Sequence, residues 1–137
     1  MRAFLLALGL VCTVAPAMAA LPPQHYEEAR RTADTVVVIE VDHVSQPPMT
    51  QGFGECAVQG RVIGVERGAQ YRVGAPIRLA VPCRFAAAPT PVGAVLYREF
   101  EVLQRARYGR AYLDASGRLA LSQYDILNAW TGPAPQP

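Results

Sequence analysis

Few residues of this 137-residue chain could bind a metal ion. The candidate ligands outside the first 19 residues are His25, His43, Cys56 and Cys83. Zinc sites in proteins usually combine pairs of ligands a few residues apart, as in C-x-x-C. None of these four residues has such a near partner. We therefore predict no metal site and no cofactor, and we interpret the two cysteines as a disulfide pair.

Hydrolytic chemistry lacks a suitable nucleophile. Beyond the first 19 residues the serines are Ser45, Ser116 and Ser122, and Ser116 lies in D-A-S-G-R, which differs from the G-x-S-x-G nucleophile elbow. Asp42 and His43 are neighbours in an apolar run typical of a strand, so their side chains should point to opposite faces. We predict no catalytic residues, and a hydrolase is the third and unsupported hypothesis.

One cluster of arginine and tyrosine residues could bind a partner. It comprises Arg105, Arg107, Tyr108, Arg110 and Tyr112, and we call it the Arg/Tyr surface. Guanidinium groups bind anions and aromatic rings stack on planar ligands, so the cluster could form a binding surface. The alternative is a solvated face whose arginines pair with nearby acids. These acids would be Glu99, Glu101 and Asp114.

The beginning of the chain resembles a secretory signal. Met1-Arg2 precedes the uncharged apolar run Ala3–Ala15, and Ala17-Met18-Ala19 has the small residues of a cleavage site. The run is shorter than the roughly 20 apolar residues of a membrane-spanning helix. We therefore predict a signal peptide over residues 1–19, cleavage near Ala19/Ala20, no transmembrane segment, and a periplasmic or secreted protein.

Export leaves an even number of cysteines. Cys12 would be removed with the signal peptide; the alternative, a lipid-modified Cys12, lacks the preceding Leu and small residue that lipid attachment favours. Cys56 and Cys83 then have only each other in an oxidising compartment. All thirteen basic residues are arginine, and loss of Arg2 leaves twelve against eleven acids. This near balance argues against a nucleic-acid partner.

The segment from Cys56 to Cys83 reads as a hairpin with a turn in Gly68–Gly74. The symmetric register pairs Cys56 with Cys83, Val58 with Val81, Gly60 with Leu79, and Val62 with Ile77. This register makes one apolar face and brings the cysteines opposite each other. Gly60 and Gly64 suggest a bulge, and the register beyond Val62 stays open because Ile63 is also apolar.

The other elements follow from apolar patterns and turn residues. They are a helix over Gln24–Ala33, a strand over Thr35–Val44, loops over Ser45–Glu55 and Arg84–Ala94, and a final hairpin of Arg110–Asp114 and Arg118–Leu127. Val95–Arg107 fits either a strand or a helix, and we favour a strand over Val95–Glu101 followed by a helical turn. The Pro-rich segment 131–137 is predicted to be a disordered tail.

These elements predict a mainly β fold: a small five-stranded OB-like barrel with a short N-terminal helix and one disulfide, in a single domain over residues 20–130. Three segments carry a family resemblance. They are Ala33–Val38, Arg61–Gly68 and Val73–Leu79, followed by Cys83. In this order they resemble the netrin-module or TIMP-like (tissue inhibitor of metalloproteinases) OB-fold domains of exported bacterial proteins. The family's animal inhibitors use an amino-terminal cysteine that is absent from Ala20-Leu21-Pro22, so the resemblance does not imply metalloprotease inhibition here.

The sequence thus favours a non-enzymatic exported binding module of the bacterial cell envelope, whose partner is an unknown envelope or extracellular protein. The alternative is a small-molecule or protease-inhibitor-type binder that uses the barrel mouth near Met49, Phe53 and Tyr97. Met49 and Phe53 could instead plug one end of the core.

Overall fold

A computed structural model describes residues 20–132, in which six strands and two helices form. The elements are α1 (Pro23–Thr32), β1 (Thr35–Ser45), β2 (Phe53–Arg67), β3 (Pro76–Arg84), β4 (Arg98–Glu99), α2 (Phe100–Arg105), β5 (Tyr108–Leu113) and β6 (Leu119–Leu127). The predicted signal peptide and residues 133–137 of the predicted tail lie outside the described residues.

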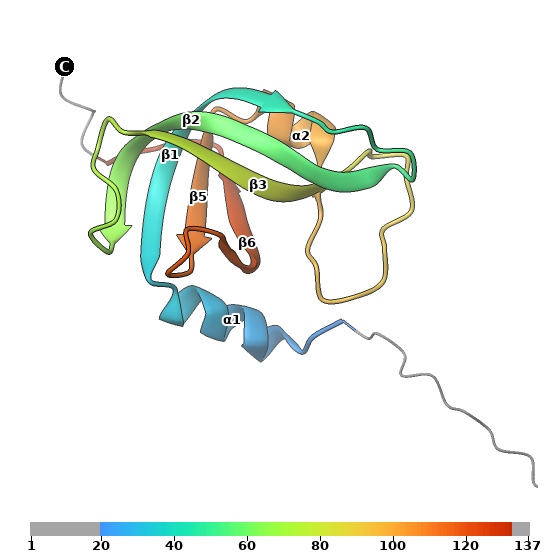
Figure 1. The fold of residues 1–137 in the computed structure, drawn as a ribbon, viewed down its shortest axis with the longest axis horizontal. Helices are drawn as coiled ribbons and strands as arrows, with labels where there is room; N and C mark the ends of the chain where they lie inside the picture. The colour runs from blue at the N-terminus through green and yellow to red at the C-terminus, as the bar shows by residue number, and fades with distance from the viewer. Residues whose placement is uncertain (1–19, 133–137) are drawn as a thin grey trace, which may run out of the picture.

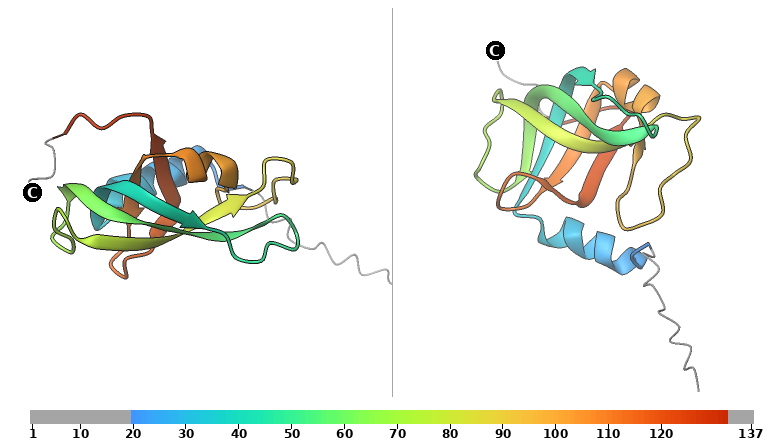
Figure 2. Two further views of the ribbon diagram at one scale, coloured as in Figure 1. Left: turned by 90° about the horizontal axis from the view of Figure 1, so that it is seen from above. Right: turned by 45° about the vertical axis from the view of Figure 1, so that its right-hand side comes forward.

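The strands form one curled sheet in the order β4-β3-β2-β1-β5-β6. Every pairing is antiparallel except that of β3 with β4. The sheet curls into a half-barrel, with α1 across one end and α2 at the opposite end (Figures 1 and 2). The predicted mainly β fold is confirmed at this level, but the barrel has six strands where five were predicted, since β4 is counted with the other five.

Helix α1 is held to the barrel by polar contacts, since none of its residues is buried. Pro23 occupies the first turn, where its missing N–H costs no hydrogen bond. Arg30 and Arg31 lie in the last turn, where they oppose the negative end of the helix dipole. The helix ends before Ala33, whose extended backbone leads directly into β1.

Strand β1 is the centre of the sheet, as its β-branched sequence predicts. Val37 and Ile39 are fully buried in the main core, between β2 and β5. Val38 points to the other face and is also fully buried. Its neighbour Gly64 lies against the ring of Trp130, where a Cβ atom would approach Cζ2 to 2.7 Å. The indole thus covers part of the outer face.

Bulges bend the β1–β2 pair. Ile63 has no partner between the pairs Val38↔Gly64 and Ile39↔Val62, which confirms a bulge in the predicted region. A second irregularity between Val41 and His43 changes which residues point inward. His43 is therefore exposed and Val44 joins the core, whereas the uninterrupted alternation predicted that His43 would share a face with Ile39.

The predicted hairpin exists, but its predicted register is wrong by two residues. The observed pairs are Gly54↔Cys83, Cys56↔Val81, Val58↔Leu79 and Gly60↔Ile77. A shift of two leaves every side chain on the same face, so apolar alternation cannot distinguish the two registers. The cysteines are then diagonal neighbours with a Cα–Cα distance of 5.7 Å, and the predicted Cys56–Cys83 disulfide is present.

The ambiguous segment contains both kinds of structure. The strand-then-helix order predicted for Val95–Arg107 is confirmed, but the strand shrinks to Arg98–Glu99 and α2 begins at Phe100. β4 pairs in parallel with β3 only at Cys83 and Arg84, and residues 95–97 before β4 form no ladder. Leu103 buries the inner face of α2 in the core.

Candidate functional site

A cavity lies between β3 and β6. It has a volume of about 600 Å³, within the usual range for a ligand pocket. Both strands are parallel to β1, because each is separated from it by two antiparallel pairings. No ladder joins β3 to β6, so the half-barrel is open here. We call the gap between residues 77–82 of β3 and residues 119–122 of β6 the seam.

The wall formed by β3 has an unpaired backbone edge. One edge of β3 pairs with β2 from Pro76 to Arg84, whereas the other pairs with β4 only at Cys83 and Arg84. Within residues 20–132, the second edge has no ladder partner between Ile77 and Pro82. Pro82 has no N–H to donate, so the hydrogen-bonding potential is concentrated in the residues before it.

The wall formed by β6 is distorted by a bulge. Along the β5–β6 ladder, Ala111 pairs with Tyr124 and Leu113 with Leu119, which leaves residues 120–123 of β6 opposite a single residue of β5. Leu121 and Ser122 have φ values of 43° and 61°. This left-handed conformation costs about 1 to 3 kcal/mol for each non-glycine residue. Contacts elsewhere must therefore hold the bulge in place.

The side chain of Gln123 supplies those contacts. It is fully buried, and its Nε2 donates to the carbonyl oxygen of Leu121 at 2.9 Å. Its Oε1 accepts a hydrogen bond from Arg30 Nε at 2.6 Å. The same guanidinium donates to both carboxylate oxygens of Asp125 at 3.0 and 3.2 Å and lies 5.2 Å from the ring centroid of Tyr112. Helix α1 is thus attached to the bulge.

Arg98 joins the two sides of the barrel beyond the cavity. Its Nε donates to the carbonyl oxygen of Tyr124 at 2.9 Å, which connects β4 to β6 through a side chain. The pKa of Arg98 is lowered, mainly because the guanidinium is partly buried. The carboxylate of Asp125 opposes this shift, and the positive charge of Arg30 adds to it. This side-chain hydrogen bond therefore links the two sides of the half-barrel next to the seam, which itself has no β3–β6 ladder.

Charged side chains of both signs line the cavity: Glu55, Arg78, Asp114 and Arg118. Asp114 is occupied by its own turn, because its carboxylate accepts hydrogen bonds from Ser116 Oγ at 2.5 Å and from the backbone N–H of Ser116 and Arg118. These hydrogen bonds lower the pKa of Asp114, and the bond from Ser116 Oγ has the largest effect. The Arg118 side chain is 83% exposed and lies 3.9 Å from Asp114. Arg78 is also exposed, and no ion pair to it occurs within the described residues.

The Arg/Tyr surface is divided among several contacts. Tyr108, Arg110 and Tyr112 share the outer face of β5, because the alternate residues of this strand are buried. Arg110 pairs with Glu66 at 2.7 Å, and Arg107 pairs with Glu40 at 3.2 Å. The hydrogen bond from Arg110 to Glu66 raises the pKa of that guanidinium.

These pairings bear on the alternative for the Arg/Tyr surface. Arg107 and Arg110 each form an ion pair with an acid of β1 or β2, whereas the alternative expected Glu99, Glu101 and Asp114 as the partners. Arg107 also lies 5.2 Å from the ring centroid of Tyr108. Arg105 is exposed in the last turn of α2. Its role in partner binding stays a prediction.

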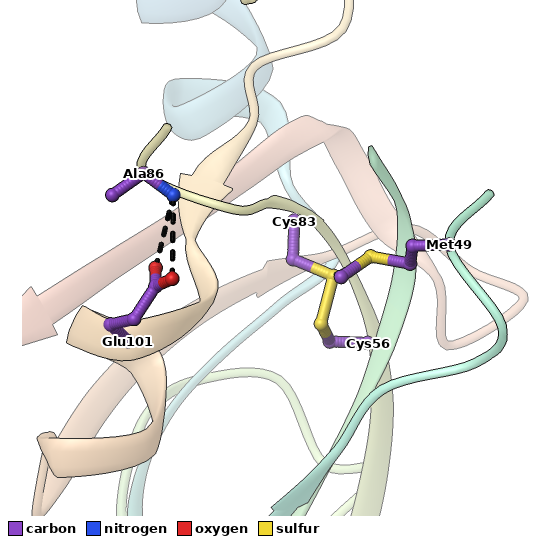
Figure 3. The surroundings of a disulfide bond; sticks show 5 residues. All are labelled: Met49, Cys56, Cys83, Ala86 and Glu101. Carbon is purple, nitrogen blue, oxygen red and sulfur yellow. Dashed lines mark hydrogen bonds between the residues drawn. A yellow bond between two sulfur atoms is a disulfide. The ribbon is translucent and has the colours of Figure 1, made fainter. Parts of the chain in front are cut away.

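The residues of the predicted barrel mouth pack on one another near the disulfide. Phe53 and Tyr97 make an edge-to-face contact with their ring centroids 5.6 Å apart. Met49 Sδ lies 3.7 Å from Cys83 Sγ and covers the disulfide, as Figure 3 shows. In the same figure, the backbone N–H of Ala86 donates to the carboxylate of Glu101, which ties the following loop to α2. Phe53 and Tyr97 therefore pack on each other, and Met49 packs on the disulfide.

We compared the chain with known proteins. No family model, no curated protein and no solved structure matches it.

Neither a cluster of metal ligands nor a membrane-spanning helix occurs among the described residues. Over residues 20–132, the structure brings no three His, Cys, Asp or Glu side chains together in a group able to hold a metal ion. The same part of the chain contains no helix long and apolar enough to cross a membrane. The seam offers backbone hydrogen-bonding groups and exposed arginines, which are groups that bind a ligand.

Sequence reasoning missed most residues of the seam. One signal was present: in Pro76–Pro82 the outward positions are Arg78 and Ala80, between two prolines, a pattern typical of an edge strand. Nothing local indicated that Gln123 would be buried. The alternation over Leu119–Leu127 predicted a strand that leaves the core at Gln123, and the bulge makes that prediction wrong.

Proposed function

We propose that this chain is a non-enzymatic exported binding module of the bacterial cell envelope, and that the seam is its binding site. The observation that carries the proposal is the cavity of about 600 Å³ beside the unpaired edge of β3. Arg78 and Arg118 add exposed guanidinium groups, which bind anions strongly.

The strand connections support an OB-like barrel within this proposal. The chain makes the meander β1-β2-β3, passes through α2, and returns in the hairpin β5–β6, whose first strand pairs with β1. A partly open barrel of this kind is typical of OB folds. Together with the motifs quoted above, it favours the netrin-module or TIMP-like resemblance as a working hypothesis.

The disulfide supports export. Cys56 and Cys83 are bonded and both are fully buried, so the bond is part of the core. Structural disulfides persist in oxidising compartments and are rare in the reducing cytosol. This agrees with the predicted cleavage near Ala19/Ala20 and with a periplasmic or secreted location.

Affinity capture from an envelope extract of the source organism tests the proposal. The bait is residues 20–137, compared with the charge-reversal variant Arg78→Glu. Arg72→Glu is the matched control. It makes the same change of charge, and Arg72 is exposed but does not line the cavity. We expect a partner that is recovered with the wild type and with the control, and is lost with Arg78→Glu.

Other results would redirect or overturn the proposal. A partner that is lost only with Arg105→Gln/Arg107→Gln would move the site to the Arg/Tyr surface. A small molecule that raises the melting temperature of the wild type, but not that of a variant substituted at Tyr97, would favour the alternative at the barrel mouth. Catalytic turnover in a broad hydrolase screen would contradict a non-enzymatic function.

A further inference from the structure

We propose that the seam accepts a single extended peptide segment of a partner protein, which pairs with the free edge of β3 and carries an acidic side chain between Arg78 and Arg118. The inference rests on the proposed binding function and specifies the ligand of the same site. It is an addition of one strand to a sheet edge, in which main-chain hydrogen bonds give affinity and alternate side chains give specificity.

The backbone of β3 calls for an extended ligand. A strand edge presents N–H and C=O groups at the spacing of another strand, and these groups remain unpaired from Ile77 to Pro82 within the described residues. The pairing of Cys83 and Arg84 with β4 closes one end of this stretch. A ligand of about five or six residues would therefore fill the available edge, at about 3.3 Å per residue.

The bulge in β6 is the observation that separates this seam from an incidental gap. Two consecutive residues, Leu121 and Ser122, adopt the left-handed backbone conformation, which is unfavourable for residues other than glycine. A fully buried amide, that of Gln123, holds them there and is itself held by Arg30 of α1. A regular β6 could form a parallel ladder with β3 and close the barrel. Residues 120–123 of β6 are bulged instead, and β6 forms no ladder with β3.

The shape of the seam selects a lone strand over a second copy of this chain. A peptide paired with β3 has the wall of β6 on its other side, since Leu119 and Ser122 line the same cavity. A strand of a second copy is attached to its own sheet, which would collide with that wall. Pro76 and Pro82 also limit how far two β3 edges could pair with each other.

The charges of the walls favour an acidic side chain on the ligand. Arg78 projects from β3, and Arg118 precedes β6 on the other side of the cavity. The carboxylate nearest Arg118 is Asp114, which is already bound to Ser116 and to the backbone of its own turn. A ligand carboxylate between the two guanidinium groups would form an ion pair with both of them. Glu55, at the far end of the edge, disfavours a second acid there.

The test uses three synthetic peptides and ¹⁵N-labelled protein of residues 20–137 at low salt. The first is acetyl-Thr-Val-Thr-Glu-Thr-Val-Thr-amide, the second replaces Glu by Lys, and the third is the Glu peptide with every backbone amide N-methylated, so that neither of its edges can donate. We expect the Glu peptide to shift the amide signals of residues 77–82 and 119–122 and to slow hydrogen exchange at Arg78 and Ala80. The Lys peptide should bind about fivefold more weakly, and the N-methylated peptide should not bind.

The variant Arg78→Glu should reverse the preference between the Glu and Lys peptides, with Arg72→Glu as the control that keeps it. Spectra of both variants without peptide establish that they are folded. Shifts confined to the Arg/Tyr surface, equal binding of the N-methylated peptide, or no binding of any peptide would overturn the inference. Concentration-dependent shifts of the protein alone, with a dimer in sedimentation, would assign the edge to a second copy. If a partner protein is captured equally well by the wild type and by Arg78→Glu, the proposed binding function stands and the acidic peptide is rejected as the ligand.

Discussion

The two sides of the seam are stabilised by different interactions. On one side, the β2–β3 hairpin is held by apolar alternation and by the Cys56–Cys83 disulfide. On the other, β6 is bulged and attached to α1 through the side chains of Arg30 and Gln123. The first side resembles an ordinary protein core, and the second depends on a polar network that fixes an unfavourable backbone. The comparison indicates that the hairpin provides stability and the β6–α1 corner shapes the site.

The largest expected effect is on the hairpin side. The double variant Cys56→Ala/Cys83→Ala should lose about 3 to 4 kcal/mol of unfolding free energy, because it removes a cross-link from the unfolded chain. This corresponds to a melting temperature lowered by more than about 10 °C. Binding of the Glu peptide should persist below the new midpoint, since β3 keeps its pairing with β2.

Thermal unfolding by circular dichroism measures this difference, and thiol titration of the native protein provides the control. Met49 covers the disulfide, so dithiothreitol should reduce the native wild type slowly and the Met49→Ala variant faster. An unchanged melting temperature for the double variant, or two free thiols in the exported native protein, would contradict the division of roles between the two sides.

A smaller effect is expected on the polar side. Gln123→Leu removes both hydrogen bonds of the buried amide and leaves Arg30 Nε and the carbonyl of Leu121 without these partners. The expected cost is about 1 to 3 kcal/mol, measured by urea denaturation. The amide signals of residues 119–122 should shift more than those of the hairpin. Gln104→Leu is the control, because Gln104 is exposed and its side chain makes no hydrogen bond within the described residues. Equal effects of the two variants would show that Gln123 does not hold the bulge.

The same contrast explains what the sequence could predict. The strand Thr35–Val44 follows from its β-branched residues, and the disulfide follows from the cysteine count. The final turn follows from the residues Asp114–Gly117 between two apolar runs, and Gly117 has a positive φ of 80°, which glycine tolerates. The hairpin register was wrong because a shift of two preserves the buried face. These features depend on residues that are near in the sequence or that repeat with a fixed period.

The seam depends on contacts that have no local pattern. Gln123 can be buried because its side-chain oxygen accepts a hydrogen bond from Arg30, which lies 93 residues earlier in the chain. A polar residue in an alternating run predicts exposure, so the network of α1 could not be anticipated from Leu119–Leu127 alone. Whether β3 and β6 close or stay open likewise depends on the curl of the whole sheet. The Arg/Tyr surface was visible in the sequence, but its partners Glu40 and Glu66 lie on strands far from it in the chain.

A pair of tyrosines sharpens the comparison at the level of single hydroxyl groups. The Tyr124 hydroxyl is buried in the main core beside Gly109, and burial raises its pKa. It has no hydrogen-bond partner among residues 20–132. Tyr124→Phe should therefore leave stability within about 0.5 kcal/mol of the wild type or increase it. Tyr112 belongs to the polar network and donates to Asp125 at 3.2 Å, so Tyr112→Phe should cost about 1 kcal/mol. Urea denaturation of both variants checks the order, and a larger loss for Tyr124→Phe would reverse it.

The smallest effect concerns the turn that carries Arg118. Hydrogen bonds from Ser116 Oγ and from backbone N–H groups hold the pKa of Asp114 below its ordinary value of 3.8. Because the folded pKa is the lower one, the turn gains stability from the ionised carboxylate above pH 3.8 and loses it as the pH falls through the folded pKa. Ser116→Ala should raise the pKa of Asp114, as measured by carboxyl ¹³C titration. An unchanged pKa would mean that Ser116 does not hold Asp114 ionised, and Asp114 would then be free to compete with a ligand carboxylate for Arg118.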